Sequence, residues 1–249
     1  MVANRDLTLA TDLDGTFLGG SEWQRRDFYH YLQSRRDRLR LIFVTGRDLD
    51  FVQSLSQQAD IPSPDYVIAD VGTTVIDGRT WQPLTAVQAW IDHGWDHANE
   101  RVRSLLAAEP GLRPQPIAAP RRVSYYYEPD RLQTATLDKI RAAGFDYILS
   151  AERYLDVLPA GVCKGTTLLK LLTAIDATGD RTITAGDTLN DLSLFATGLR
   201  GIAVGNAEPC LRRALRAYNN VYISPYPGTA GIWDGLRHFG CAIAATASP

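Results

Sequence analysis

Short apolar runs alternate with segments of helical periodicity in the first part of the chain. Leu7–Thr11, Leu39–Val44 and Tyr66–Ala69 are the apolar runs, and Glu22–Arg36 and Leu49–Gln58 between them carry apolar residues at helical spacing. A short apolar run bounded by turn residues is typical of an interior strand in a parallel sheet, because helices cover both faces of such a sheet. The alternation therefore predicts an α/β fold with a doubly wound parallel sheet.

The pattern changes near Gly78 and returns after residue 156. In between, one long amphipathic helix is expected over Val87–Ala108, a proline-rich loop over Pro110–Pro120 and a helix over Leu132–Ala143. The strands predicted in this segment are Arg122–Tyr127, Phe145–Leu149 and Tyr154–Leu158. This mixture predicts a smaller α+β cap of residues 79–156, inserted into a core formed by residues 1–78 and 157–249.

After the insertion the strand and helix alternation resumes. Helices are predicted over Thr166–Ala174, Asp191–Ala196 and Glu208–Ala217. Strands are predicted over Thr182–Ala185 and Gly201–Val204. These elements extend the same parallel sheet, so the two core segments are expected to fold together.

The composition excludes several classes of partner. The 249 residues carry a formal net charge of −2 and no basic stripe, so no nucleic-acid partner is expected. No apolar stretch is long enough to span a bilayer, and the N-terminal residues lack the apolar region of a signal peptide. The three cysteines have no paired spacing, which argues against a disulfide framework. We therefore expect a cytoplasmic protein with no membrane partner.

Two carboxylates follow the first predicted strand. Asp12 and Asp14 lie two residues apart, and residues at this spacing on an extended backbone face the same way. Without neutralisation they would repel each other and one pKa would rise. A Mg²⁺ ion would relieve the repulsion, because it prefers oxygen ligands. Taken alone, the pair is more typical of a polar strand-to-helix turn with a capping aspartate.

A second acidic cluster follows a later predicted strand. Asp187, Asn190 and Asp191 have the spacing that places residues on one face of a helix, and Gly186 allows a tight turn before them. Asp187 alone is typical of a helix N-cap. Ligands of open α/β sheets bind outside the carboxyl ends of the strands, where both acidic clusters are expected to lie. Together they predict a pocket for a divalent cation with a carboxylate nucleophile, which indicates phosphoryl chemistry.

Two further features fit a phosphate. Thr45, Gly46 and Arg47 follow the second predicted strand, and a hydroxyl with backbone N–H groups at a helix N-terminus suits a phosphate oxygen. The alternative role of Thr45 is a helix N-cap, which is compatible with phosphate binding. Lys164 opens the segment that returns to the core, where a cation could screen phosphate and carboxylates.

These strings together resemble the four motifs of the haloacid-dehalogenase-like phosphatases. The strings are Asp12-Leu13-Asp14-Gly15-Thr16, Thr45, Lys164 and Gly186-Asp187-Thr188-Leu189-Asn190-Asp191. Their order and spacing match over essentially the whole chain, and an insertion after the third strand is similar to the C2-type cap. The resemblance implies a Rossmann-like core, an α+β cap and Mg²⁺ as cofactor.

Other strings resemble the sucrose-phosphate and mannosylfructose-phosphate phosphatases. They are Thr45-Gly46-Arg47, Pro64-Asp65-Tyr66, Val71-Gly72-Thr73, Val123-Ser124-Tyr125, Asp156-Val157-Leu158-Pro159 and Gly205-Asn206-Ala207-Glu208-Pro209. The match does not extend to every sugar-contacting residue of the cap. The resemblance therefore implies a sugar-phosphate phosphatase and leaves the sugar open.

The resemblance also implies a role for each motif residue. Asp12 would be the nucleophile that forms an aspartyl-phosphate, and Asp14 the acid and base. The Mg²⁺ ligands would be Asp12, the main-chain carbonyl of Asp14 and Asp187, with Asp191 in support. Phosphate would be held by Thr45, Gly46, Lys164 and Asn190.

The cap is expected to select the substrate by closing over the leaving group. Candidate sugar contacts are Arg47, Arg122, Ser124, Tyr126 and Asp156. The alternative is that the cap tyrosines simply alternate between its core and its surface. The leading hypothesis is a Mg²⁺-dependent phosphatase of a phosphorylated disaccharide, sucrose 6-phosphate first, with a disaccharide-phosphate synthase as a partner in the same pathway. The alternatives are mannosylfructose phosphate or another sugar or cofactor phosphate as substrate, a phosphomutase, and a non-catalytic phospho-sugar sensor.

Overall fold

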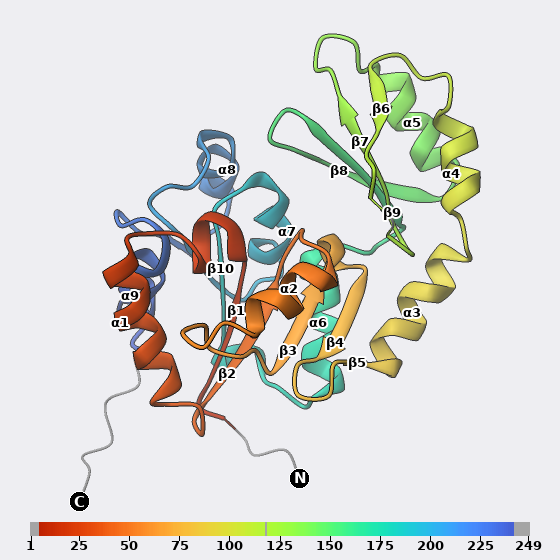
Figure 1. Ribbon diagram of the computed structural model, residues 1–249. Helices are drawn as coiled ribbons and strands as arrows, with labels where there is room; N and C mark the ends of the chain where they lie inside the picture. Colours follow the sequence, from red (N-terminus) through yellow and green to blue (C-terminus); the bar gives the residue numbers. More distant parts are fainter. Residues whose placement is uncertain (1–4, 118, 242–249) are drawn as a thin grey trace, which may run out of the picture.

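Eight strands form one sheet through the larger part of the molecule (Figure 1). This computed structural model describes residues 5–117 and 119–241. The strand order is β12-β11-β10-β1-β2-β3-β4-β5, with every pair from β12 to β3 parallel and the last two pairs antiparallel. The strands are β1 (Leu7–Thr11), β2 (Leu39–Val44), β3 (Tyr66–Ala69), β4 (Thr74–Asp77), β5 (Gln82–Pro83), β10 (Thr182–Gly186), β11 (Arg200–Ala203) and β12 (Val221–Ile223). The predicted α/β class is confirmed.

Helices cover both faces of this sheet. They are α1 (Glu22–Gln33), α2 (Leu49–Ser56), α3 (Thr85–Trp95), α6 (Lys164–Ala174), α7 (Leu192–Phe195), α8 (Pro209–Ala214) and α9 (Gly228–His238). Leu9 and Phe43 pack into one core cluster with Ile232 of α9, whereas the neighbouring Ala10 and Ile42 pack into another with residues of α3 and α6. Successive strand residues thus point to opposite faces, and both faces are buried, which explains the apolar runs of the sequence.

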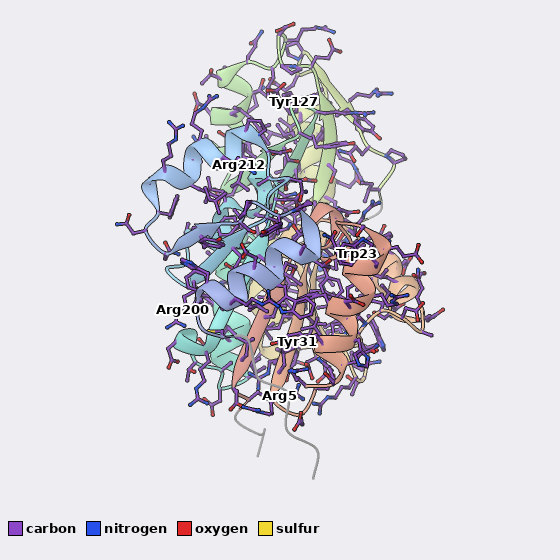
Figure 2. All side chains as sticks on the ribbon, turned by 90° about the vertical axis from the view of Figure 1, so that its left-hand side faces the viewer. Arg5, Trp23, Tyr31, Tyr127, Arg200 and Arg212 are labelled. Carbon is purple, nitrogen blue, oxygen red and sulfur yellow. The ribbon has the colours of Figure 1, made fainter. Side chains whose placement is uncertain are left out.

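A second sheet of four antiparallel strands lies beside the carboxyl ends of the first (Figure 1). Its order is β6-β7-β9-β8, and α4 and α5 pack on it. Its elements are α4 (Asn99–Leu106), β6 (Leu112–Pro114), β7 (Val123–Tyr127), α5 (Thr134–Ala142), β8 (Phe145–Ser150) and β9 (Tyr154–Pro159). Figure 2 shows Tyr127 of this cap at one end of the molecule and Arg5, next to β1, at the other.

The prediction of one long helix over Val87–Ala108 is wrong. The segment forms two helices, α3 and α4, because Asp96 and His97 adopt positive φ angles of 45° and 54° that end α3. The two helices pack into different cores: Ile91 of α3 belongs to a core cluster of the large sheet, and Val102 of α4 belongs to the cap cluster. The break therefore lies where the chain passes from one hydrophobic core to the other.

Other elements differ from the predictions at their ends or were missed. Residues 112–114, which fall in the predicted proline-rich loop, form β6 and pair with β7. The antiparallel strands β4 and β5, the edge strand β12 and the helix α9 were not predicted; these strands are short, and α9 contains several glycines. The predicted helix over Glu22–Arg36 ends earlier, at Gln33.

The predicted limits of the cap stay predictions. β5 at Gln82–Pro83 pairs within the large sheet, and β9 continues to Pro159 within the small one. Strand pairing therefore favours a cap that begins a few residues later and ends a few residues later than residues 79–156.

Candidate active site

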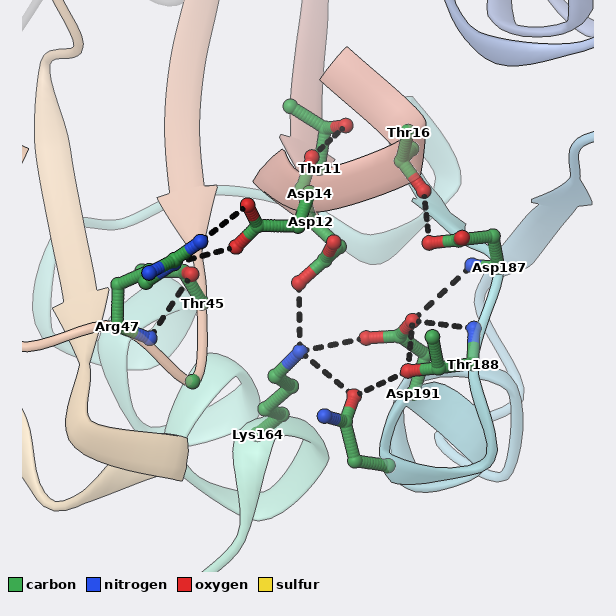
Figure 3. Close-up of polar contacts among 12 residues, drawn as sticks. Thr11, Asp12, Asp14, Thr16, Thr45, Arg47, Lys164, Asp187, Thr188 and Asp191 are labelled. Carbon is green, nitrogen blue, oxygen red and sulfur yellow. Dashed lines mark hydrogen bonds and ion pairs between the residues drawn. The ribbon is translucent and has the colours of Figure 1, made fainter. Parts of the chain in front are cut away.

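Four segments bring acidic and basic side chains together at the carboxyl ends of β1, β2 and β10 (Figure 3). Asp12 follows β1 directly, Thr45 follows β2 and Asp187 follows β10, while Lys164 is the first residue of α6. The parallel pairing of β1 with both β2 and β10 sets these strand ends side by side. The sequence predicted this convergence from the strand ends alone.

Lys164 lies at the centre of the cluster. Its Nζ donates to Asp12 Oδ1 and Asp191 Oδ1, both at 2.7 Å, and to Asn190 Oδ1 at 2.9 Å (Figure 3). The side chain is completely buried. Burial by itself lowers the pKa of Lys164, but the neighbouring carboxylates of Asp12 and Asp191 outweigh it and leave the pKa above its ordinary value. Lys164 is therefore a fixed positive charge beside Asp12.

Asp187 faces Asp12 from the end of β10. Its Oδ1 accepts a hydrogen bond from Thr16 Oγ1 at 2.7 Å and its Oδ2 one from Asn206 Nδ2 at 3.3 Å. Gly15, with a φ of 76°, permits this approach, because a Cβ there would lie 2.2 Å from Asp187 Oδ2. Burial, and to a smaller extent the nearby Asp191, raise the pKa of Asp187 to about 7, although the Thr16 hydrogen bond opposes the shift.

Both carboxylate oxygens of Asp191 accept hydrogen bonds from the protein. Its Oδ2 accepts from the backbone N–H groups of Asp187 and Thr188, both at 3.0 Å, while its Oδ1 accepts from Lys164. The predicted helix over Asp191–Ala196 is shortened to α7 at Leu192–Phe195, and the residues before it form a single tight turn. Asp191 thus closes the turn that holds Asp187 and supports Lys164.

The donor set fits a hard divalent cation. Ligand oxygens of Asp12, Asp187 and Asp191 lie within 4.8 Å of one another, and all three residues are buried. Burial, followed by the nearby carboxylates, raises the pKa of Asp12, with Lys164 opposing the shift. A cluster of buried carboxylates that one lysine does not neutralise is the setting in which an oxygen-liganded Mg²⁺ is stabilising.

Asp14 points to a different partner. Its two oxygens accept from Arg47 Nε at 2.8 Å and Nη2 at 2.9 Å, a bidentate ion pair (Figure 3). The guanidinium of Arg47 also lies over the ring of Phe51, 4.5 Å from its centroid. Both partners are about half-exposed, with side-chain exposures of 52% and 51%, so Asp14 can contact a ligand from the solvent side.

Thr45 is the first residue of the loop between β2 and α2 and is completely buried. Its Oγ1 accepts from the backbone N–H of Arg47 at 3.1 Å. Gly46 and Asn190 line the surface nearby. Of the four predicted phosphate-binding residues, Gly46 and Asn190 are therefore at the cavity surface, whereas Thr45 and Lys164 are buried and are not among its lining residues.

A cavity of about 430 Å³ separates this cluster from the cap. The predicted substrate residues Arg47, Arg122, Tyr126 and Asp156 line it. Ser124 does not; its hydroxyl donates to Asp156 Oδ1 at 2.5 Å and so orients a residue that does.

Sequence reasoning missed several cap residues that face the cavity, namely Gln115, Ile117, Ser150 and Tyr154. Tyr154 packs against Tyr126, with 5.8 Å between ring centroids, because the register of β7 and β9 sets the two residues opposite each other. No local pattern marks these residues: strand pairing brings Ser150 and Tyr154 to the cavity, and Gln115 and Ile117 reach it from the loop after β6.

Comparison with known proteins gives a consistent result. Residues 5–240 match the family model described as sucrose-6F-phosphate phosphohydrolase. The chain is 31% identical over 243 residues to mannosylfructose-phosphate phosphatase of Agrobacterium fabrum, covering 93% of this chain and 96% of that protein. It is 39% identical over 235 residues to glucosylglycerol-phosphate synthase of Pseudomonas anguilliseptica, covering 94% of this chain.

The chain is shorter than some of these relatives. It spans 31% of the length of the Pseudomonas synthase and 59% of the length of sucrose-phosphatase 1 of tobacco, to which it is 28% identical. Among the helices of the described residues, none combines the length and apolar character needed to cross a membrane.

The fold matches a solved structure over nearly its whole length. Sucrose-phosphatase of Synechocystis sp. PCC6803, solved with sucrose and phosphate, superposes with a TM-score of 0.84. The alignment covers 95% of this chain and 98% of that one at 24% sequence identity. This likeness confirms the fold: a mostly parallel α/β core with a second, smaller sheet beside it.

Proposed function

The chain belongs to the sucrose-6F-phosphate phosphohydrolase family, and we propose that it hydrolyses the phosphate monoester of a phosphorylated disaccharide, with sucrose 6-phosphate as the first candidate. One observation carries the proposal: Asp12, ion-paired to the buried Lys164, lies beside Asp187 at the floor of a cavity roofed by the cap. A carboxylate next to a fixed positive charge and a cation site is suited to attack phosphorus.

Asp12 is the nucleophile in this proposal. An oxygen of Asp12 forms a bond to phosphorus as the bond from phosphorus to the sugar oxygen breaks, which leaves an aspartyl-phosphate. Water then attacks the phosphorus, releases phosphate and restores the carboxylate. Lys164 opposes the repulsion between the carboxylate and the phosphate dianion, and a cation held by the acidic cluster would do the same.

Mg²⁺ is the cofactor that we propose, held by Asp12 and Asp187 together with the main-chain carbonyl of Asp14 and with Asp191 in support. When bound, it supplies positive charge that stabilises the developing negative charge on the phosphoryl oxygens. Among the described residues, Asp12, Asp187 and Asp191 are the group of acidic side chains close enough together for this task.

Asp14 is the acid and base in this proposal. Protonated, it gives its proton to the leaving sugar oxygen; ionised, it accepts a proton from the attacking water. The bidentate contact with Arg47 holds its carboxyl at the cavity wall before substrate binds.

Thr45, Gly46, Lys164 and Asn190 hold the phosphoryl oxygens in the same scheme. Asn190 accepts from Lys164 at 2.9 Å through its Oδ1, so its amide N–H₂ is oriented away from the lysine. Arg47 also lines the cavity and adds positive charge close to the entering phosphate.

The cap selects the sugar in this proposal. The cavity of about 430 Å³ is in the size range of pockets for small-molecule ligands, and its cap side carries both aromatic and hydrogen-bonding groups. Tyr126 and Tyr154 line the cavity with aromatic side chains, and the guanidinium groups of Arg113 and Arg153 lie over the Tyr126 ring. Asp156 offers a carboxylate to hydroxyl groups. We propose that the cap, predicted over residues 79–156 and set a few residues later by its strand pairing, serves this purpose.

The test is phosphate release from a panel of sugar phosphates with and without Mg²⁺. Sucrose 6-phosphate, mannosylfructose phosphate, glucosylglycerol phosphate and monosaccharide phosphates cover the substrates that the relatives' names suggest. Disaccharide phosphates are expected to give the highest kcat/KM. A preference for monosaccharide phosphates over every disaccharide phosphate would refute the substrate class.

The nucleophile is tested by Asp12→Asn, which should lower kcat by at least about 1,000-fold. Burial raises the pKa of Asp12, which makes its ionised form costly, so a neutral amide there should leave the fold intact. Circular dichroism of the variant checks this, and near-normal phosphate release by a folded variant would contradict the mechanism.

A phosphomutase shares the first step and is distinguished by its products, a sugar bisphosphate or an isomerised sugar phosphate in place of free phosphate. A sensor would bind the sugar phosphate without hydrolysing it.

The partner that this function requires is a disaccharide-phosphate synthase. A 39% identical segment of a synthase among the relatives supports that link.

A further inference from the structure

The loop between β2 and α2, residues 45–48, is held by the turn that follows β3. The backbone N–H of Val71 donates to the carbonyl of Thr45 at 3.1 Å, and that of Asp70 donates to the carbonyl of Arg47 at 2.9 Å. These two bonds fix the residues on either side of Gly46. Neither bond uses the backbone carbonyl of Gly46, which can therefore accept a hydrogen bond from another donor.

That donor comes from the cap. Arg122, the residue before β7, donates from Nη1 to the carbonyl of Gly46 at 3.2 Å and from Nη2 to Asp70 Oδ1 at 3.0 Å. Nη1 also lies 3.5 Å from Asp156 Oδ1 in β9. Arg122 therefore binds the loop, the turn after β3 and the cap sheet at once, and its side chain is only 5% exposed.

The turn after β3 depends on these contacts. Asp70 and Val71 have φ angles of 52° and 59°, a left-handed conformation that is unfavourable for a β-branched residue such as valine. Asp70 is held from both sides, since its Oδ2 accepts from Thr74 Oγ1 at 2.9 Å and its Oδ1 from Arg122. Gly72 follows with a φ of 109°, and a Cβ there would lie 2.6 Å from the backbone of Cys163, next to Lys164.

We propose that Arg122 is a positioning residue that completes the phosphate-binding loop from the cap, so that the loop is fully held only while the cap is seated on the core. The proposal rests on the proposed function, in which this loop receives the phosphoryl group. By reciprocity, phosphate in the loop stabilises the seated cap by the same factor by which the seated cap strengthens phosphate binding.

The donors of Arg122 support this role over the sugar contact that the sequence predicted. Both terminal nitrogens are engaged by the protein, and Nε is the one nitrogen of this side chain without a partner in the described parts of the chain. If Arg122 contacted the sugar, its replacement would weaken the binding of sugar substrates alone. If Arg122 positions the loop, its replacement weakens the binding of every phosphate ligand.

The experiment compares wild type with Arg122→Gln on two substrates, sucrose 6-phosphate and p-nitrophenyl phosphate, and with inorganic phosphate as inhibitor. Loss of charged hydrogen bonds at a buried site should raise the phosphate inhibition constant by roughly 10- to 100-fold. The value of kcat/KM should fall by a similar factor for both substrates. Arg122→Lys keeps the positive charge but loses the forked geometry of the guanidinium. Its phosphate inhibition constant and its kcat/KM should lie between those of wild type and Arg122→Gln.

Arg121→Gln is the matched control. Arg121 is the neighbouring arginine, and its ion pair is with Asp92 of α3, far in sequence from the loop. This variant should retain the wild-type phosphate inhibition constant. Thermal unfolding of each variant checks the fold, and Asp70→Asn, which removes the charge of the partner carboxylate, repeats the test if Arg122→Gln does not fold.

Two results would overturn the proposal: an unchanged phosphate inhibition constant in folded Arg122→Gln, or a loss confined to sucrose 6-phosphate. The proposed function can fail separately. If the wild type hydrolyses neither substrate, calorimetric binding of inorganic phosphate to wild type and Arg122→Gln still measures the positioning effect. A wild type that binds no phosphate contradicts both proposals.

Discussion

Asp12 and Asp14 are two residues apart, line the same cavity and have different partners. Asp12 is buried against Lys164, whereas Asp14 is half-exposed and paired with Arg47. These environments suit the two carboxyls to the different roles that we propose, since Asp12 has a fixed cation beside it and Asp14 has access to solvent. The sequence predicted that both carboxylates enter one site. It also predicted Lys164 as a cation that screens the carboxylates, but it did not predict the pairing of Asp14 with Arg47.

Asp187 gives a prediction about pH at the same scale. Its pKa is raised from 3.8 to about 7, chiefly by burial, so its ionised form is less favourable in the folded protein than in the unfolded chain. The contribution of Asp187 to stability is therefore complete below pH 4 and is lost as the pH rises through about 7. Without Mg²⁺, the midpoint of thermal unfolding should fall between pH 5 and pH 7.5 more steeply than in Asp187→Asn.

Addition of Mg²⁺ provides the check on that prediction. A bound cation favours the ionised carboxylate, so saturating Mg²⁺ should raise the unfolding midpoint more at pH 7.5 than at pH 5. The variant Asp187→Asn should show a much smaller response to the metal. An equal response in the variant would exclude Asp187 from the cation site.

At the scale of elements, the break between α3 and α4 shows what periodicity cannot reveal. Apolar residues continue at helical spacing from Val87 to Leu106, but the first half packs on the core and the second half on the cap. Trp95 Nε1 donates to Asn99 Oδ1 at 2.8 Å across the break. The spacing of apolar residues is the same whether a helix packs against the large sheet or against the cap sheet. The sequence pattern therefore predicted one continuous helix.

The break can be tested through Asp96, which has a φ of 45° at the end of α3. Asp96→Val places a β-branched residue in the left-handed region and should lower the free energy of unfolding by about 1–2 kcal/mol. Asp96→Gly should maintain or slightly raise it. Denaturant unfolding of both variants measures the difference, and equal stabilities would argue that the helix continues through residue 96 in solution.

At the scale of the whole molecule, core and cap together make the cavity. The core supplies the acidic cluster and the phosphate loop, and the cap supplies Arg122 and the pair Tyr126 and Tyr154. In the proposed function, the cap would both cover the substrate and, through Arg122, support the loop below it. Chemistry and specificity would then come from different sheets that meet at one cavity.

This division predicts the effect of Tyr154→Ala. Loss of an aromatic face on the cap should raise KM for sucrose 6-phosphate by about 10-fold and leave kcat/KM for p-nitrophenyl phosphate within about twofold. Tyr127→Ala is the control, because Tyr127 lies in β7, the strand that pairs with the β9 strand of Tyr154, and is outside the set of cavity-lining residues. Equal losses on both substrates would show that Tyr154 supports the cap fold rather than the sugar.

The sequence by itself determined the parallel sheet, the strand ends that carry Asp12, Thr45 and Asp187, and the class of chemistry. These features are local, because a short apolar run and the polar residues after it determine a strand end and its loop. Only the tertiary structure decided the job of Arg122, the position of Tyr154 at the cavity and the break in the long helix. Each of these depends on contacts between segments far apart in the chain, and such contacts leave no periodic signal in the sequence.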